Sequence, residues 1–506
     1  MSIKNSSRRI KAYVNIAFAF ALELVNVLAG FIVPRLVIRT FGSDANGLVS
    51  SISNFLGYVT LLQSGAGSVI RVALYKPLAQ KNHEELCTVV RTAESFFRKI
   101  AYITIGYIAI LAVAFPTIIT PEYEFWYTFS LVVVVGISTV ARYFFGLSYQ
   151  MLVEADQRSY IFSAIQIVTV ILNAVSTVVL TNLGCSIQVV KAVSAIFFVL
   201  RPLSINLYAK RYYKIDRSVK CNNALISQRW DGLAQAVAYF VHTKAPVFAL
   251  TVFSTLKNVS VFSIYALITA GLTSFVNCIN KGMRALIGNI VAKGEKEKLQ
   301  QVFSSYQTLL HILATACFAT ACITAHSFLD VYLKDVHDAE YIQPVFAILL
   351  FTAEFLYCLR LPYSVVMMAA GKFREMKKPA YIEAGINFTL SCVLVHFLGL
   401  VGVAIGTLVA MTYRTVSFIN FLRKDILHIS RGKQIAKYAV TFAVYALCIC
   451  LFGMISVKNT GYLSWAIYAA SVFVGCGVII LAVNFLFWKE DTKTALRYVM
   501  RRKTKR

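Results

Sequence analysis

Positively charged side chains recur inside the most apolar stretches of this sequence. Arg35 and Arg39 are four residues apart, so on a helix they share one face, and Arg71 ends the next apolar stretch. Further cations lie within later apolar stretches: Arg142, Lys191, Lys244, Arg360 and Arg414. A cation that faces lipid near the bilayer centre costs about 2.5–3.5 kcal/mol. We therefore expect these side chains to line a wet interior or to form ion pairs; near a span end, snorkelling to lipid phosphate is the alternative.

Several apolar stretches also carry a polar stripe at helical spacing. On one stretch the stripe consists of Ser274, Asn277, Lys281 and Arg284. Another is formed by Asn54, Tyr58, Ser64, Ser68 and Arg71, and a third by Asp231, Gln235 and His242. Such a stripe predicts a helix face in contact with water, and hydrogen bonding between neighbouring helices is the alternative.

A cavity lined by guanidinium and ammonium groups is expected to bind an anion. Arginine matches phosphate oxygens with two parallel hydrogen bonds, and lysine adds a point charge. A sugar chain on a lipid diphosphate is an anion that cannot cross the membrane without a carrier. The candidate substrate-binding residues are Arg35, Arg39, Arg71, Arg142, Lys191, Lys244, Asn277, Lys281, Arg284, Arg360 and Arg414.

Acidic side chains within the apolar stretches are few: Glu23, Asp231, Glu354 and Glu383. Glu23 and Asp231 are candidates for binding a coupling ion, H+ or Na+, and a structural ion pair is the alternative. Glu354 and Arg360 are six residues apart and do not share a helix face, so no local pair is predicted. The cysteines and histidines show no metal-ligand spacing, so we expect no metal and no cofactor.

The elements that position these residues are expected to be membrane-spanning helices. The chain is 58% hydrophobic and 14% charged, against about 45–50% and 25% in a typical soluble protein. Its apolar blocks are about 20 residues long, the length of a helix that crosses a bilayer. About fourteen spans are expected, near residues 12–38, 47–69, 100–119, 126–149, 160–182, 187–208, 231–255, 261–283, 305–328, 345–370, 380–398, 401–421, 435–456 and 464–488. The predicted fold class is all-α, a polytopic membrane protein.

The distribution of charge predicts the orientation in the membrane. Of the 50 lysines and arginines, roughly forty fall on the side of both termini and about five on the other, which predicts cytoplasmic termini. Arg35 and Arg39 lie on the outer side, against this rule, and a functional role explains them best. Because the positive charge gathers on one side of the membrane, the net charge of +27 does not indicate nucleic-acid binding. The basic tail Met500–Arg506 is expected to contact anionic lipid.

Two echoes within the sequence indicate an internal repeat. The segments after Arg71 and Arg284 both reach a leucine after fifteen residues, and the segments after Arg201 and Arg414 are also alike. The alternative is that any two membrane hairpins look similar. The repeat predicts two parallel six-helix lobes, residues 1–208 and 230–433, joined by a cytoplasmic linker, residues 209–229. Two additional helices, residues 434–488, and a basic cytoplasmic tail, residues 489–506, follow.

Two such lobes suggest alternating access to a site near the middle of the membrane, in a cationic cavity between them. Gly371-Lys372 does not belong to a phosphate-binding loop, because Val366 stands where the leading glycine belongs. Transport is therefore expected to be driven by an ion gradient or by substrate supply.

The first hairpin resembles a known family. The runs FIVPRLVIRTFGSDANGLVSSISNFLGY (residues 31–58) and GAGSVIRVALYKPLA (residues 65–79) are similar to the amino end of bacterial polysaccharide flippases of the O-antigen or capsule type. These belong to the multidrug/oligosaccharidyl-lipid/polysaccharide exporter superfamily. The resemblance covers essentially the whole chain, with Arg201-Pro202-Leu203 closing the first lobe. It implies a multi-pass protein of the bacterial cytoplasmic membrane that is coupled to an ion gradient.

The expected function is therefore that of a flippase in surface polysaccharide or lipopolysaccharide biosynthesis, and not of an enzyme. Its substrate would be undecaprenyl-diphosphate-linked oligosaccharide, moved from the inner to the outer leaflet, with membrane lipid and other polysaccharide-assembly proteins as further partners. One alternative is a multidrug exporter of the same superfamily, which a basic cavity disfavours for cationic drugs. A membrane polysaccharide polymerase is a further alternative, disfavoured because the longest outer loop, residues 329–343, is short.

Overall fold

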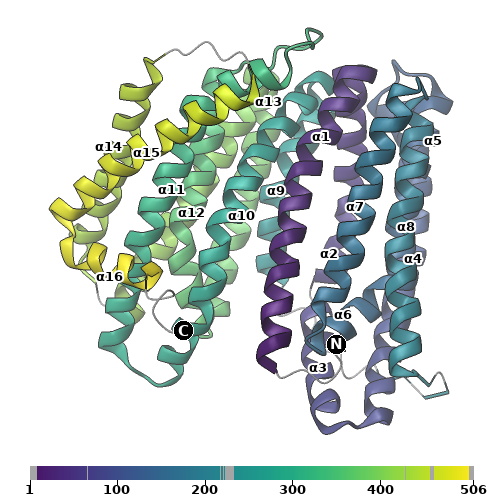
Figure 1. The fold of residues 1–506 in the computed structure, drawn as a ribbon, viewed down its shortest axis with the longest axis horizontal. Coiled ribbons are helices and arrows are strands. Elements are labelled where there is room, and N and C mark those ends of the chain that lie inside the picture. Colours follow the sequence, from purple (N-terminus) through teal and green to yellow (C-terminus); the bar gives the residue numbers. More distant parts are fainter. Residues whose placement is uncertain are drawn as a thin grey trace. The chain divides into compact units, whose positions relative to one another are not determined.

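The computed structural model describes residues 8–64, 66–216, 218–219, 221–222, 233–427, 429–455 and 461–500. Within these ranges the regular elements are all helices (Figure 1). The predicted all-α fold class is therefore confirmed.

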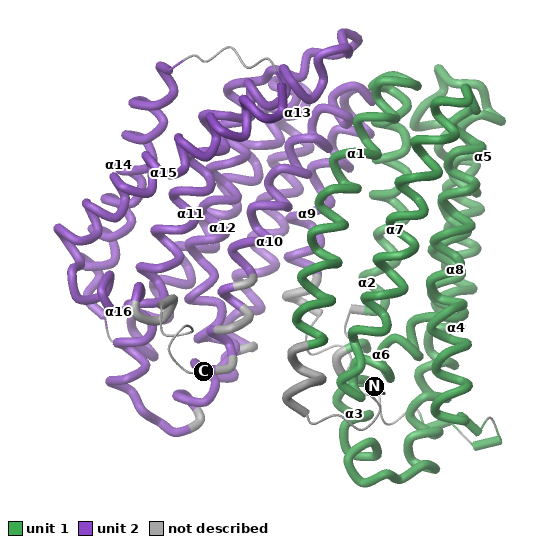
Figure 2. Tube along the Cα trace, viewed as in Figure 1, with its two compact units in different colours: residues 1–236 green, residues 237–506 purple. Residues whose placement is uncertain are grey.

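The chain divides into two compact units, residues 1–236 and 237–506 (Figure 2). The elements of unit 1 are α1 (Arg8–Leu56), η2 (Gly57–Val59), α2 (Thr60–Ser64), α3 (Ala66–Gln80), α4 (His83–Ala114), η3 (Phe115–Ile119), α5 (Phe125–Ala141), η4 (Arg142–Gly146), α6 (Leu147–Ala155), α7 (Ser159–Asn182) and α8 (Ile187–Tyr213). Unit 2 takes in most of α9 (Leu233–Phe253), then α10 (Leu256–Ala292), α11 (Lys296–Tyr332), α12 (Pro344–Ala369), α13 (Phe373–Leu422), η6 (Arg423–Leu427), α14 (Arg431–Gly453), α15 (Tyr462–Phe487) and α16 (Lys489–Met500). The predicted lobe, linker and tail boundaries stay predictions.

The helices account for the predicted spans. Among the described residues, eleven helices are long and apolar enough to cross a membrane. Two of them, Val14–Gln63 and Arg374–Leu427, each overlap two predicted spans, and the shorter apolar helix Val237–Phe253 overlaps another. Each predicted span therefore overlaps a helix, and the chain is a multi-pass membrane protein.

Glycines bend the two helices that contain a pair of spans. Gly42 in α1 has a φ of 87°, and Gly399 in α13 has a φ of 52°. Glycine reaches such positive φ values at little cost because it has no Cβ. In α1 the helix continues directly after the bend at Gly42.

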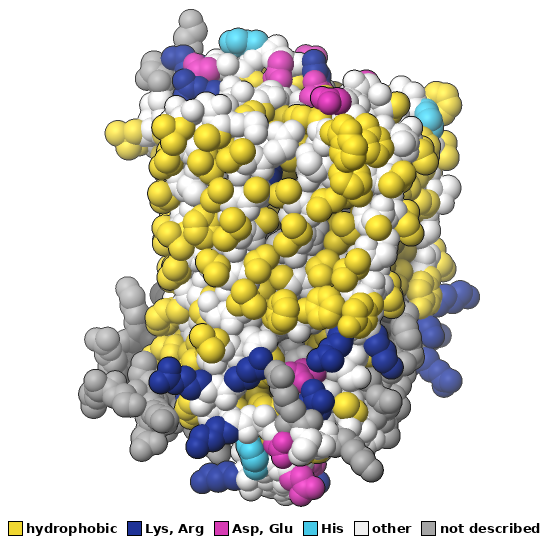
Figure 3. Space-filling model, turned by 90° about the vertical axis from the view of Figure 1, so that its right-hand side faces the viewer, with side chains coloured by type: hydrophobic (Ala, Val, Ile, Leu, Met, Phe, Trp, Pro, Cys, Tyr) yellow, Lys and Arg dark blue, Asp and Glu magenta, His cyan; other side chains and the backbone are white. Residues whose placement is uncertain are grey.

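The surface of unit 1 matches a membrane environment. On the face that Figure 3 shows, hydrophobic side chains form a broad belt, and lysine and arginine side chains gather below it. Exposed apolar residues of α4 and α7 belong to this kind of surface: Tyr102, Ile103, Ile110, Val113, Val168 and Val175. Large apolar side chains are exposed in this way when lipid, and not water, covers them.

A π-helical turn, η4, follows α5 and begins at Arg142, one of the predicted substrate-binding cations. Such turns occur frequently at functional sites. The last residue of η4, Gly146, lies against Pro202 of α8, where an added Cβ would stand 2.5 Å from the Pro202 Cβ. Glycine at this position therefore allows η4 and α8 to pack closely.

Gly146→Ala is expected to destabilise unit 1 by about 1–3 kcal/mol, because the new methyl group overlaps the rigid ring of Pro202. The midpoint of thermal unfolding of the purified protein in detergent measures this loss. Gly106→Ala in α4 is the matched control, since a Cβ at Gly106 meets no atom within 4 Å. Equal midpoints for the two variants would contradict the close contact at Gly146.

Candidate functional site

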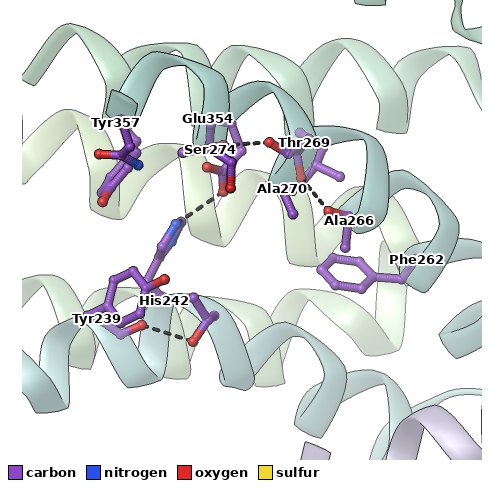
Figure 4. A pocket seen from close by; sticks show the side chains of 13 residues that line it. Tyr239, His242, Phe262, Ala266, Thr269, Ala270, Ser274, Glu354 and Tyr357 are labelled. Atoms are coloured by element: carbon purple, nitrogen blue, oxygen red, sulfur yellow. Dashed lines mark hydrogen bonds and ion pairs between the residues drawn. The ribbon is translucent and has the colours of Figure 1, made fainter. Parts of the chain in front are cut away.

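Unit 2 contains a polar pocket among α9, α10 and α12 (Figure 4). Its volume is about 310 Å³. The lining residues are Tyr239, His242, Thr243, Phe262, Ala266, Thr269, Ala270, Thr273, Ser274, Asn277, Leu350, Glu354 and Tyr357. Hydroxyl, amide, imidazole and carboxylate groups thus face one cavity inside an apolar helical unit.

The polar wall of the pocket follows from the helical repeat of α10. Thr269, Thr273 and Asn277 recur every four residues and therefore lie on one face of the helix. Ser274 and Asn277 belong to the stripe predicted from the sequence, and both line the pocket. Farther along the stripe Arg284 is exposed, and the side chain of Lys281 lies outside the described ones.

A histidine–glutamate contact crosses this pocket from α9 to α12. The Nε2 atom of His242 lies 3.1 Å from Oε1 of Glu354, and both side chains are largely buried. Figure 4 shows His242 pointing towards Glu354. The ring of Tyr357 stacks on the imidazole, with ring centroids 5.6 Å apart. The Nδ1 atom of His242 is buried and has no hydrogen-bond partner within the described part of the chain.

A second charged cluster adjoins the first. Glu383 of α13 accepts a hydrogen bond of 2.8 Å from Nη1 of Arg360 through Oε1 and pairs with Arg414 through Oε2. The guanidinium of Arg360 lies 5.3 Å from the ring centroid of Tyr357, the residue that stacks on His242. Glu383 carries one negative charge and its two arginine partners carry two positive charges. One net positive charge therefore remains in the interior of unit 2, next to the His242–Glu354 pair.

The His242–Glu354 contact can exist in two forms. It is an ion pair when the imidazole is protonated and a hydrogen bond from a neutral donor otherwise. Both side chains line the cavity. Among the residues that the structure describes, no group of three or more His, Cys, Asp and Glu side chains is placed to hold a metal ion.

Comparison with known proteins gives matches only at the level of structure. No family model matches the chain, and no curated protein matches it. The structure of lipid II flippase MurJ in an inward closed conformation matches with a TM-score of 0.69 and 12% identity over 93% of this chain and 99% of that one. The inward-facing conformation of a multidrug resistance MATE family transporter of the MOP superfamily matches with a TM-score of 0.61 and 15% identity, covering 82% of this chain and 99% of that one. The chain has the fold of these transporters.

A further match is a ligand complex of the MATE multidrug transporter DinF-BH, with a TM-score of 0.60 and 14% identity, covering 84% of this chain and 98% of that one. At these identities the similarity establishes the transporter fold. The resemblance predicted from the first hairpin is thereby confirmed for the fold, and these structural neighbours are transporters and not enzymes.

In unit 1 the predicted site residues lie on several helices. Arg35 and Arg39 lie on α1 shortly before the bend at Gly42, and Glu23 lies exposed earlier on the same helix. The exposed Arg71 of α3 pairs with Glu154, with Nη2 3.1 Å from Oε2. Arg142 begins η4, and Lys191 lies half-buried near the start of α8.

In unit 2 the structure separates the predicted residues by environment. Asn277 lines the polar pocket, Lys244 is half-buried on α9, and Arg360 and Arg414 are buried on Glu383. Asp231 lies outside the described residues. Whether these cations contact substrate stays a prediction, and for Arg360 and Arg414 the ion pairs with Glu383 already provide a reason for their burial.

Sequence reasoning did not find the His242–Glu354 pair. His242 stood out as part of a polar stripe and Glu354 as one of the few internal acids, but they lie 112 positions apart in the chain. Only the tertiary structure brings them together across one pocket. The scarcity of internal acids was the signal in the sequence that could have found this pair. Each buried acid requires a cation or a proton, so a basic partner for Glu354 was to be expected.

Glu383→Gln is expected to destabilise the protein by about 3–5 kcal/mol, because it leaves two buried guanidinium groups without a counter-charge. Thermal unfolding in detergent and the yield of folded protein measure this effect. Glu375→Gln is the control, because Glu375 lies on the same helix as Glu383 and forms an exposed pair with Lys372. Exposed pairs of this kind contribute about 0–1 kcal/mol to stability. A Glu383→Gln variant as stable as the control would contradict the structural role of the cluster.

Proposed function

We propose that this protein is a flippase that moves a polyprenyl-diphosphate-linked oligosaccharide from the inner to the outer leaflet of a bacterial cytoplasmic membrane. The observation that supports this most is the match to a lipid II flippase, which extends over 93% of this chain at a TM-score of 0.69. The multidrug transporter structures match 82% and 84% of the chain at lower TM-scores. The substrate is inferred from this difference together with the surplus of cations.

The surplus of cations supports an anionic substrate. Within the spans, positively charged side chains outnumber acids, and Glu383, Glu354 and Glu154 are already paired with basic residues. A positively charged site attracts a diphosphate and repels a cationic drug. A multidrug exporter of the same fold is the second candidate because two of the structural neighbours are multidrug transporters. Drug susceptibility of a deletion strain separates the two functions.

The proposal includes an orientation and a biological setting. With both termini cytoplasmic, the basic side of the protein faces the leaflet in which the lipid-linked sugar is loaded. A flippase requires a glycosyltransferase that supplies its substrate and a polymerase or ligase that removes it. Other polysaccharide-assembly proteins are therefore the expected partners.

We assign the coupling role to the His242–Glu354 pair in place of Glu23; the prediction for Asp231, which lies outside the described residues, stays open. Glu23 is exposed on α1, and it contacts no basic group among the described residues. The imidazole and carboxylate of the pair, in contrast, lie 3.1 Å apart in a polar pocket. Proton exchange at the pair changes the charge of the pocket by one unit. Such a change beside the Arg360–Glu383–Arg414 cluster alters the stability of one packing arrangement relative to another.

Arg35→Ala combined with Arg39→Ala is expected to abolish surface polysaccharide while the protein still inserts into the membrane. The two cations lie on one helix face, where they are proposed to hold the diphosphate. Surface polysaccharide is measured by gel analysis, and insertion by the amount of protein in the membrane fraction. Arg98→Ala combined with Lys99→Ala removes the same charge from exposed positions of α4 and is the control. Normal polysaccharide from the Arg35/Arg39 variant would contradict the assignment.

His242→Gln is expected to abolish the acceleration of transport by an imposed proton gradient. Glutamine keeps a hydrogen bond to Glu354 but cannot carry a proton across the pocket. Transport of lipid-linked saccharide into proteoliposomes is measured with and without the gradient. His337→Gln is the control, since His337 is exposed in the loop before α12. Acceleration of the His242→Gln variant equal to that of the unaltered protein would exclude the pair as the coupling site.

A further inference from the structure

Unit 1 contains a small pocket with two arginines where η4 meets α7 and α8. The pocket has a volume of about 150 Å³. Its lining residues are Arg142, Gly146, Gln150, Phe162, Gln166, Arg201, Pro202 and Ile205. Two guanidinium groups and two amides thus face one cavity.

The two arginines of this pocket lie close enough to repel each other electrostatically. Within the described part of the chain neither Arg142, which is exposed, nor Arg201, which is half-buried, forms an ion pair. Arg201 donates a hydrogen bond of 3.1 Å from Nε to the hydroxyl of Thr169. Glu154 contacts Gln150 and Arg71 instead. Two like charges side by side in a membrane-spanning unit are stabilised by a bound anion.

An apolar groove adjoins the arginine pocket. It has a volume of about 420 Å³ and lies among α4, α5, η4 and α8. Its lining residues are Ile105, Ile108, Val133, Ile137, Val140, Ala141, Phe145 and Val199. The lining contains no charged and no hydrogen-bonding side chain, and Ile105, Ile137 and Phe145 are each more than 40% exposed. The groove is therefore suited to a hydrocarbon chain.

The turn η4 joins the two cavities. Ala141 and Phe145 line the apolar groove, whereas their chain neighbours Arg142 and Gly146 line the arginine pocket. Consecutive residues of a helical segment point in different directions, so the two cavities lie on different faces of this segment. An amphiphile bound here would place its anionic head and its apolar chain on either side of η4.

We propose that η4 and its neighbours form a binding site for a polyprenyl diphosphate, with the diphosphate between Arg142 and Arg201 and the first isoprene units in the apolar groove. The site lies wholly within unit 1, and its assignment to this lipid rests on the proposed function. Two guanidinium groups match a diphosphate, which carries a negative charge on each phosphorus. A phospholipid phosphodiester carries one charge and leaves the second arginine without a counter-charge.

Photo-crosslinking to the full-length protein tests the proposal. The probe is farnesyl diphosphate with a diazirine at the end of its prenyl chain, added to protein in neutral phosphatidylcholine nanodiscs. Peptide mapping by mass spectrometry is expected to find the label on groove residues within α4, α5 or α8. Arg142→Gln combined with Arg201→Gln is expected to reduce this labelling about tenfold, because it removes charge-assisted hydrogen bonds to the diphosphate.

Matched variants separate the head site from the chain site. Ile105→Gln, in the groove, is expected to reduce labelling, whereas Ile110→Gln, which is more exposed on the same helix and lines no part of the groove, is not. Arg98→Gln is the charge control. Excess inorganic diphosphate is expected to compete with the probe, and excess phosphatidylglycerol is not. Thermal unfolding of each variant shows that it is folded.

Three outcomes would overturn the proposal: label found only outside the groove, labelling unchanged in the double arginine variant, or equal competition by phosphatidylglycerol. Failure here is distinguishable from failure of the proposed function. Transport of lipid-linked saccharide by a protein that is not labelled in the groove would refute this site and leave the flippase function intact. Labelling as expected in a protein that transports drugs and no lipid-linked saccharide would refute the function.

Discussion

The free energy of a charge away from water is the constraint on which this structure depends. In unit 2 the protein itself supplies partners for its buried charges. Glu383 pairs with one arginine from α12 and one from α13, and Glu354 contacts the imidazole of His242. Breaking such a contact leaves a buried charge uncompensated, so the helices that contribute the partners are held together. Tyr357 contacts both His242 and Arg360, so the two clusters lie next to each other.

Unit 1 meets the same constraint differently. Arg71 at the exposed end of α3 has a carboxylate partner in Glu154, but Arg142 and Arg201 face a shared pocket without one among the described residues. Two buried arginines of unit 2 thus share one glutamate, whereas two arginines of unit 1 share a pocket. That contrast, more than the total charge of +27, is the basis for proposing an anionic ligand in unit 1.

Local backbone features position these groups. The bends at Gly42 and Gly399 let one continuous helical stretch supply two membrane spans, because glycine accepts a positive φ. The π-helical turn η4 shifts the faces of the helix that follows α5, and Gly146 allows the turn to lie against Pro202. Small changes of backbone geometry thus decide which side chains face a cavity and which face lipid.

The sequence by itself determined the class of this protein and the position of its spans. Blocks of about 20 apolar residues dictate membrane helices, since no other structure satisfies the backbone in hydrocarbon except a closed barrel. The stripe that includes Ser274 and Asn277 was predictable because a helical repeat is a local property. The tertiary structure alone decided which cations are paired. Glu383 with Arg360, and His242 with Glu354, come from separate helices, and spacing along one helix carries no information about contacts made across helices.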